Sequence, residues 1–124
     1  MAWNFTSDRR IYLQLMEQVK LRMATGVYPA GSRLPSVREL AAEASVNPNT
    51  MQRALAQLEA DGLIFAQRTS GRYVTDREET VMNLKTELAQ AIVQQFLIQM
   101  KELGISPAEA AKLVAQTNIP EKEA

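Results

Sequence analysis

The chain contains no cysteine and no histidine among its 124 residues. It therefore lacks the side chains of disulfides, of Cys/His zinc sites, of a Cys–His pair and of a Ser–His–Asp triad. The five glycines stand singly, so no glycine-rich phosphate loop is present. Glu39 and Glu43 are four residues apart, a spacing more typical of a solvated helix face than of an acid–base pair. The sequence predicts no metal site, no cofactor and no enzyme activity.

Long apolar runs are also missing, although 46% of the residues are hydrophobic. No stretch approaches the roughly 20 apolar residues that cross a bilayer. The first residues lack the basic and apolar regions of a signal peptide. Together with the absence of cysteine, these features predict a cytoplasmic protein with no membrane partner.

The net charge of zero conceals two halves of opposite sign. Residues 1–77 hold ten Lys/Arg, nine of them arginine, and seven acidic residues, a net charge of +3. Residues 78–124 hold four lysines and seven glutamates, a net charge of −3. Because the planar guanidinium of arginine suits phosphates and guanine edges, the first half is a candidate for nucleic-acid binding. The change in character predicts two domains, 1–77 and 78–124.

The first half contains three segments with helical spacing of apolar residues. The first covers residues 11–24, with an N-cap expected near Ser7 or Asp8 and an end at Gly26. The second covers 37–44 and opens with a capping box from Ser36.

The third helix is predicted over residues 48–60, with Asn47 as N-cap and Pro48 in the first position. Only three residues separate it from the second helix, which is typical of a helix-turn-helix. Two β-prone runs, 63–67 and 72–75, follow as a hairpin with a polar tip. The predicted fold is mainly α with a small β-hairpin, a winged helix-turn-helix domain.

The second half predicts a helix over residues 80–103 and, after a capping box at Ser106, a shorter helix to about 115. Two such helices carry more apolar surface than they can bury against each other, so a second copy of the chain is the expected partner. We therefore expect a C-terminal two-helix dimerisation hairpin whose interface includes Leu84, Leu88, Ile92 and Phe96.

Three stretches carry a family resemblance: RIYLQLMEQVK, GSRLPSVRELAAEASVNPNTMQRALAQLEADGLI and SGRYV. Over about residues 8–75 they resemble the DNA-binding domain of the GntR family of bacterial transcription regulators. The remainder, fewer than fifty residues, is similar to the small YtrA-type branch, which adds only a helical hairpin. The resemblance implies a homodimer that binds a palindromic double-stranded DNA operator. We expect it to be a repressor, with an activator as the alternative. Any small-molecule effector would act at the dimer hairpin or near residues 76–79.

In such regulators the recognition helix, here about 48–60, enters the major groove, and the wing, about 67–73, approaches the minor groove. This chain differs from the family pattern at three positions: Pro48, where arginine is frequent, Thr69, where glycine is common, and Arg10, where proline is frequent. Position by position it implies DNA contacts from Arg38, Asn47, Asn49, Thr50, Gln52, Arg53, Arg68, Thr69 and Ser70. Residue chemistry adds Arg33 and Arg72 as phosphate contacts and Ser36 at a helix N-terminus.

Several of these residues also have structural alternatives. Asn47 is a good cap in its own right. The amides of Asn49 and Gln52 can pair with adenine N6 and N7 or simply face solvent. Arg38 can bind DNA or pair with a carboxylate of Glu39, Glu43 or Glu59.

Three other functions compete with DNA binding. A winged helix can serve only as a protein–protein interaction module, without specific DNA binding. A small hydrolase would need a nucleophile and a base, and no such set can be assembled. An RNA-binding protein would need an aromatic stacking platform, and the seven aromatic residues do not cluster on a strand of the sequence.

Overall fold

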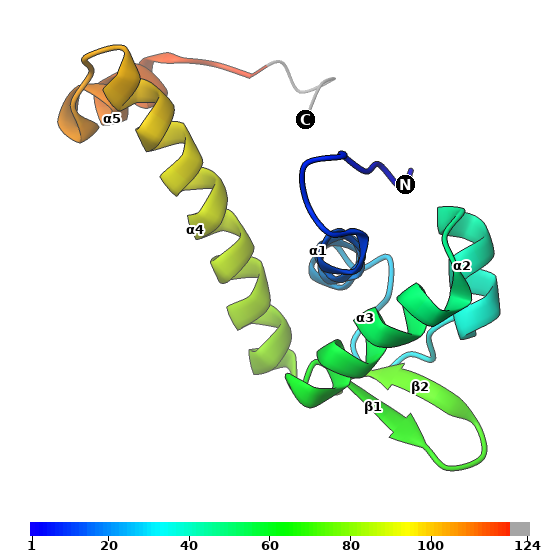
Figure 1. Ribbon diagram of the computed structural model, residues 1–124. Coiled ribbons are helices and arrows are strands. Elements are labelled where there is room, and N and C mark those ends of the chain that lie inside the picture. Colours follow the sequence, from blue (N-terminus) through cyan, green and yellow to red (C-terminus); the bar gives the residue numbers. More distant parts are fainter. Residues whose placement is uncertain (120–124) are drawn as a thin grey trace. The chain divides into compact units, whose positions relative to one another are not determined.

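The computed structural model describes residues 1–119, and the last five residues of the predicted C-terminal domain lie outside this range. Within it, the chain forms five helices and one two-stranded antiparallel sheet (Figure 1). The predicted mainly helical fold with a small hairpin is confirmed. The elements follow the order α1 (Ile11–Ala24), α2 (Val37–Ala44), α3 (Pro48–Ala60), β1 (Ile64–Gln67), β2 (Gly71–Val74), α4 (Glu78–Glu102) and α5 (Pro107–Gln116).

The chain divides into two compact units between Thr86 and Glu87. The division falls inside α4, whereas the predicted boundary at 77/78 coincides with the start of this helix. The first turns of α4 therefore belong to the N-terminal unit. No helix among residues 1–119 is both long enough and apolar enough to span a membrane.

In the N-terminal unit, α3 lies between α1 and the hairpin (Figure 1). This arrangement follows from the helical spacing of its apolar residues, which turns one face of α3 inward. The core is closed by α1, α2 and the inner face of the hairpin. Its most deeply buried side chains include Leu15, Val19, Met23, Leu40, Met51, Leu55, Leu58 and Val74.

The predicted limits of α2 and α3 are confirmed, and the caps explain them. The Ser36 hydroxyl oxygen accepts a hydrogen bond from the Glu39 amide at 3.1 Å, and a Glu39 carboxylate oxygen accepts from the Ser36 amide at 3.2 Å. Ser45 ends α2 with a left-handed φ of 57°. The Asn47 side-chain oxygen then accepts from the Asn49 amide at 2.7 Å and opens α3, with Pro48 in the first position.

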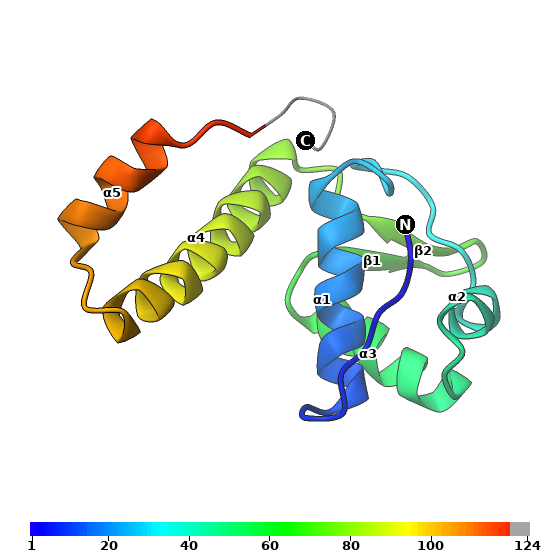
Figure 2. The same ribbon diagram turned by 90° about the horizontal axis from the view of Figure 1, so that it is seen from above.

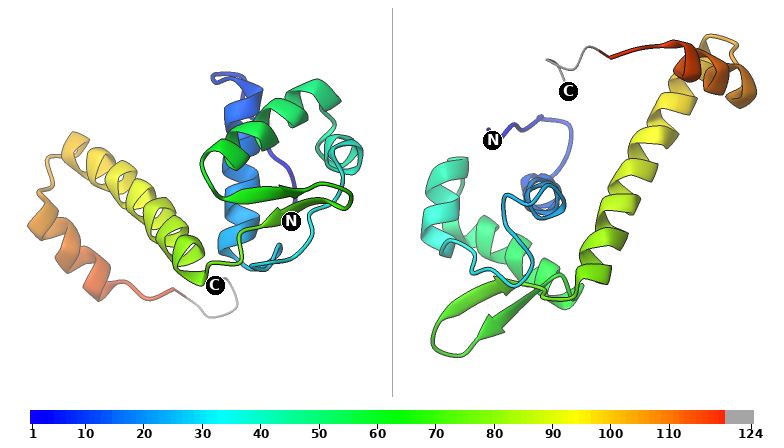
Figure 3. Two further views of the ribbon diagram at one scale, coloured as in Figure 1. Left: turned by 90° about the horizontal axis from the view of Figure 1, so that it is seen from below. Right: turned by 180° about the vertical axis from the view of Figure 1, so that it is seen from behind.

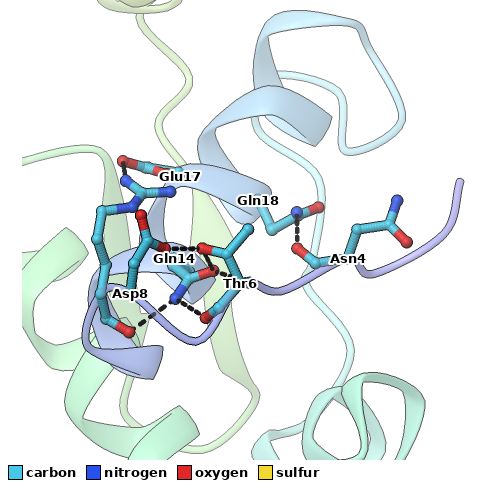
Figure 4. A network of polar contacts seen from close by, with 7 residues as sticks. Asn4, Thr6, Asp8, Gln14, Glu17 and Gln18 are labelled. Carbon is cyan, nitrogen blue, oxygen red and sulfur yellow. Dashed lines mark hydrogen bonds and ion pairs between the residues drawn. The ribbon is translucent and has the colours of Figure 1, made fainter.

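The N-cap predicted for α1 at Ser7 or Asp8 is wrong. The helix begins at Ile11, and the side chain of Arg10, which occupies the N-cap, makes no capping bond. The Asp8 carboxylate instead accepts from the Thr6 hydroxyl (Figure 4). The Asp8 carboxylate is thus engaged in a local turn and does not cap a longer helix.

A ladder of side chains on α1 holds the N-terminal segment against the helix (Figure 4). The Gln14 side chain accepts from the Thr6 amide at 2.7 Å and donates to the Thr6 carbonyl at 2.9 Å. Gln18 donates to the carbonyl of Asn4 at 2.9 Å. Four helical residues rise about 6 Å, close to the reach of two extended residues, so every fourth side chain meets every second carbonyl.

The same ladder ends at Arg22, which is buried although it carries a charge. Its guanidinium donates to the carbonyls of Met1 and Ala2 at 3.0 and 3.3 Å. The guanidinium carbon also lies 3.7 Å from the centroid of the Trp3 ring. Carbonyl dipoles and an aromatic face therefore stabilise this buried cation.

The hairpin is held on both sides of β2. Phe65 pairs with Tyr73 across the two strands, and their rings stack with centroids 5.7 Å apart. On the other side of β2, the Leu34 amide donates to the Arg72 carbonyl at 2.8 Å. Strand β2 thus lies between β1 and the connector between α1 and α2, which forms an isolated antiparallel bridge at Arg33 and Tyr73.

The C-terminal unit contains the rest of α4 and α5, which turns back beside the end of α4 (Figure 2). The predicted capping box at Ser106 is present. Ala110 is the one buried residue among the described residues of this unit, and Ile92 is 70% exposed. Leu88 and Phe96 are half-buried. Leu84, in contrast, is buried within the single chain and offers no free surface.

Candidate nucleic-acid interface

All twelve residues predicted to contact DNA lie at the surface of the N-terminal unit. The elements that carry most of them meet on one side, because α2, the beginning of α3 and the tip of the hairpin lie together (Figures 1 and 3). Nine are exposed: Arg33, Ser36, Arg38, Asn47, Asn49, Gln52, Arg53, Arg68 and Thr69. Three are half-buried: Thr50, Ser70 and Arg72.

Arg38 extends from the first turn of α2 and is exposed. Among residues 1–119, the ion pairs join Arg9 to Glu17 and Arg72 to Glu59. The alternative in which a carboxylate neutralises Arg38 is therefore not observed. Its guanidinium is available for an external anion.

Asn47 has the structural role that its position predicts, since its side-chain oxygen caps α3. Asn49 follows on the exposed first turn of the same helix, and Thr50 is half-buried beside it. The backbone amides of a first helical turn lack intrahelical partners and carry partial positive charge. In α3, however, Pro48 has no N–H, the Asn49 amide donates to the Asn47 side chain, and the Thr50 and Met51 amides donate to the Asn47 carbonyl at 3.0 and 3.1 Å. The beginning of α3 therefore offers polar side chains at the positive end of a helix rather than free backbone donors.

Arg53 is more constrained than its sequence position indicates. Its guanidinium carbon lies 3.8 Å from the centroid of the Tyr12 ring on α1. The two side chains line a shallow hollow of about 370 Å³ that also takes in Arg10, Asn49 and Thr50. The sequence did not reveal that Arg10 and Tyr12 lie beside α3, and the arginine in place of the frequent proline was the available signal for Arg10.

Polar contacts from Arg72 hold the wing against α3. The Arg72 Nε donates to Glu59 Oε1 at 3.1 Å, and Arg72 Nη1 donates to Gln52 Oε1 at 3.4 Å. At the tip, the Tyr73 hydroxyl donates to the Ser70 hydroxyl oxygen at 3.0 Å. Arg72, Gln52 and Ser70 are thus partly engaged within the protein.

Gly71 allows Arg33 to lie close to the wing. A Cβ atom at Gly71 would come within 3.3 Å of the Arg33 Nε, and the glycine has a φ of 106°, which other residues rarely adopt. Arg33 therefore presents its charge beside the wing rather than away from it. Arg68 and Thr69 complete the exposed tip.

Strands β1 and β2 carry one aromatic residue each, and these two residues, Phe65 and Tyr73, stack across the hairpin. Both rings are half-buried and lie on neighbouring strands as a cross-strand packing pair. The sequence did not reveal this pair because the hairpin register determines it. The pair contributes to the stability of the wing.

The charge of Glu39 is stabilised by the cap. Hydrogen bonds from the backbone amide and then the hydroxyl of Ser36 lower the pKa of the Glu39 carboxyl, with a smaller contribution from the charge of Arg33. At neutral pH this carboxylate is ionised and engaged in the capping box. Among residues 1–119, no ion pair joins this carboxylate to Arg38.

Comparison with known proteins gives an independent line of evidence. The family model described as "Bacterial regulatory proteins, gntR family" matches residues 11–74. The HTH-type transcriptional regulator YhcF of Bacillus subtilis is 38% identical over 105 residues, which cover 85% of this chain and 87% of the relative. The HTH-type transcriptional repressor YtrA of the same organism is 36% identical over 99 residues, covering 80% of this chain and 72% of the relative.

The solved structure of a GntR family transcriptional regulator from Listeria monocytogenes has the same fold. It superimposes with a TM-score of 0.83 at 34% sequence identity, covering 92% of this chain and all of the other. The match therefore extends beyond the winged helix into the C-terminal helices.

Proposed function

The chain belongs to the GntR family of bacterial transcription regulators and carries its DNA-binding winged helix-turn-helix, and from this premise we propose that it is a repressor that binds a palindromic operator as a homodimer. We assign DNA binding to residues 1–77 and dimerisation to 78–124. The observation that carries the proposal is the gathering of the polar start of α3, the free Arg38 and the wing tip on one side of a single unit.

The beginning of α3 supplies the sequence-reading part of this interface. Asn49 and Thr50 lie in the first turn, where amide and hydroxyl groups can reach base edges in the major groove. Asn47, whose oxygen caps the helix, has an NH₂ group left to donate to a phosphate or base. Gln52 and Arg53 lie one turn further on.

Arginines supply the phosphate contacts around this centre. Arg38 extends from α2, Arg33 lies beside Gly71, and Arg68 occupies the wing tip with Thr69 and Ser70. Ser36 adds a helix N-terminus, which favours an anion. Arg10, beside Asn49 and Thr50, is a further cation at the edge of the same surface.

The C-terminal helices support the homodimer. Val93, Phe96, Leu97 and residues of α5 line an open apolar groove of about 400 Å³, and Ile92 and Val114 are 70% and 57% exposed. Exposed apolar surface of this kind on two adjacent helices fits a second copy of the same hairpin. Leu88, Ile92 and Phe96 are the residues we assign to this interface, whereas the buried Leu84 stabilises the single chain.

The direction of regulation is argued from the relatives. YtrA of Bacillus subtilis is described as a repressor and matches most of this chain, and NagR of the same organism, also described as a repressor, is 30% identical over 106 residues. A repressor of this kind acts in the cytoplasm, where the DNA lies. A small-molecule effector would bind at the C-terminal hairpin, for example in the hollow lined by Leu97, Lys101 and Pro107, or near residues 76–79.

The proposal is tested by fluorescence anisotropy with a duplex from upstream of the protein's own gene, at several salt concentrations. We expect binding that prefers this duplex over an unrelated one and that weakens steeply with salt. Arg38→Ala is expected to weaken binding by about 1–3 kcal/mol, and to lower the salt slope by about 1 if Arg38 contacts a phosphate. Lys20→Ala, which removes a cation from α1, is the matched control.

Two outcomes would contradict the proposal. Binding that ignores sequence at every salt concentration would remove the operator-binding role. No binding even at low salt would favour the alternative, a winged helix that serves only as a protein–protein interaction module.

A further inference from the structure

One side chain of the wing is bonded to two residues of the recognition helix. Arg72, on β2, donates to Glu59 at 3.1 Å and to Gln52 at 3.4 Å. Gln52 and Glu59 are seven residues apart on α3, which places them on the same face two turns apart. Arg72 therefore bridges the recognition helix along its length.

The backbone of Arg72 is held on both sides. Arg72 pairs with Ala66 across the hairpin, and its carbonyl accepts from the Leu34 amide at 2.8 Å on the other side. The Arg72 side chain is only 21% exposed, and a guanidinium stays charged in a protein. Because a half-buried cation needs a partner, the Glu59 carboxylate anchors it in place.

The bridge has a consequence for the amide of Gln52. Its side-chain oxygen accepts from Arg72, which orients the amide with its NH₂ group away from that bond. Recognition of adenine by glutamine needs both ends, since the oxygen accepts from N6 and the NH₂ donates to N7. The amide oxygen has two lone pairs, and the bond from Arg72 takes one of them and fixes which way the amide faces. The NH₂ group is the donor that this orientation presents.

We propose that Arg72 and Glu59 are positioning residues that fix Gln52 as a hydrogen-bond donor, so that it reads acceptors in the major groove. The groups that fit are guanine N7 and O6, thymine O4 and adenine N7. This inference rests on the proposed DNA-binding function. It replaces two roles expected from the sequence, a phosphate contact for Arg72 and a two-ended adenine contact for Gln52.

A competing arrangement makes a different prediction. If Arg72 leaves Glu59 and binds a phosphate in the complex, Arg72→Gln would lower the salt slope of binding by about 1 and leave base preference intact. If Arg72 positions Gln52, Arg72→Gln leaves the salt slope unchanged and alters base preference at the positions that Gln52 reads.

The test is selection from a library of randomised duplexes by the full-length protein, followed by sequencing. Gln52→Ala first identifies the base positions that depend on Gln52. We expect Glu59→Gln to lose at least about fivefold of the base discrimination at those same positions, equivalent to about 1 kcal/mol, and to retain it elsewhere. Glu17→Gln, which makes the same change in the exposed Arg9–Glu17 pair of α1, should behave as the unsubstituted protein.

The other outcomes distinguish a failure of the proposed DNA-binding function from a failure of the positioning role of Arg72 and Glu59. If the unsubstituted protein enriches no sequence, the proposed function falls and this inference with it. If it enriches a sequence but Gln52→Ala or Glu59→Gln leaves every base preference unchanged, the inference alone is overturned. Thermal unfolding checks that Glu59→Gln is folded, and Arg72→Gln, which breaks the bridge from the strand, takes its place if it is not.

Discussion

The guanidinium carbon of Arg53, on the recognition helix, lies 3.8 Å from the centroid of the Tyr12 ring on α1. The contact joins the first helix of the domain to the helix that we assign to the major groove. It also holds a cation of α3 in one place. A cation above a tyrosine face at the surface contributes about 0.5–1 kcal/mol.

Replacement of Tyr12 measures how much this contact contributes to the free energy of unfolding. We expect Tyr12→Leu to lower the free energy of unfolding by about 0.5–1 kcal/mol, because leucine fills space but has no ring to face Arg53. Tyr12→Phe keeps the ring and should stay close to the unsubstituted protein. Urea unfolding followed by circular dichroism measures both. Equal losses in the two variants would assign the effect to packing or to the hydroxyl.

Ser36 combines a cap with a proposed phosphate contact, and two substitutions separate these roles. Ser36→Ala removes the bond to the Glu39 amide and should cost about 1 kcal/mol of stability. Ser36→Asp restores a cap but adds a negative charge, so it should restore stability and weaken DNA binding. Chemical denaturation and anisotropy are measured on the same samples. DNA binding by Ser36→Asp as tight as that of the unsubstituted protein would place Ser36 away from the phosphates.

The pKa of Glu39 leads to a prediction about pH. Hydrogen bonds from Ser36 lower the pKa of the Glu39 carboxyl below its ordinary value of 4.5. The folded state therefore binds this proton less readily than the unfolded state, so the stabilisation is complete above about pH 4.5 and is lost as the pH falls through the folded pKa. Glu39→Gln keeps a capping side chain that does not titrate. Urea midpoints between neutral pH and pH 3 should fall less steeply in this variant than in the unsubstituted protein, and identical slopes would contradict the prediction.

The dimer proposal depends on an apolar surface that a single chain leaves exposed. Ile92 is 70% exposed, so Ile92→Glu should leave the fold of one chain intact while it places a charge in the dimer interface. We expect the association constant to fall at least about tenfold. Sedimentation velocity measures association, with Gln94→Glu as a control that adds the same charge at another exposed position of α4. Equal dimerisation of both variants would place the interface elsewhere.

Local chemistry explains why some elements could be predicted from the sequence. The limits of α2 and α3 depend on neighbours in the chain: the Ser36–Glu39 box, the cap at Asn47 and the proline that follows it. The bounds of α1 also match the predicted 11–24, but its N-cap could not be predicted in this way. The capping candidate Asp8 bonds to Thr6, and the side chain that organises this end, Gln14, lies inside the helix.

Some features of the candidate site likewise follow from the local sequence, and others depend on tertiary packing. The exposure of Arg38 and Asn49 follows from their positions opposite the apolar stripes of their helices. The engagement of Arg72 with Glu59 and Gln52 does not, because the hairpin register and the packing of β1 against α3 bring these residues together from 13 and 20 positions apart. The same holds for Arg53 and Tyr12.

Hydroxyl-radical footprinting of the full-length protein on a duplex enriched by selection tests the central claim most directly. Two recognition helices related by a two-fold axis should protect two half-sites whose centres lie about one helical turn, roughly 10 base pairs, or a multiple of it apart. We expect two symmetric protected regions on one face of the duplex, both of which weaken in Arg38→Ala. A single protected region, or protection unaffected by Arg38→Ala, would contradict it.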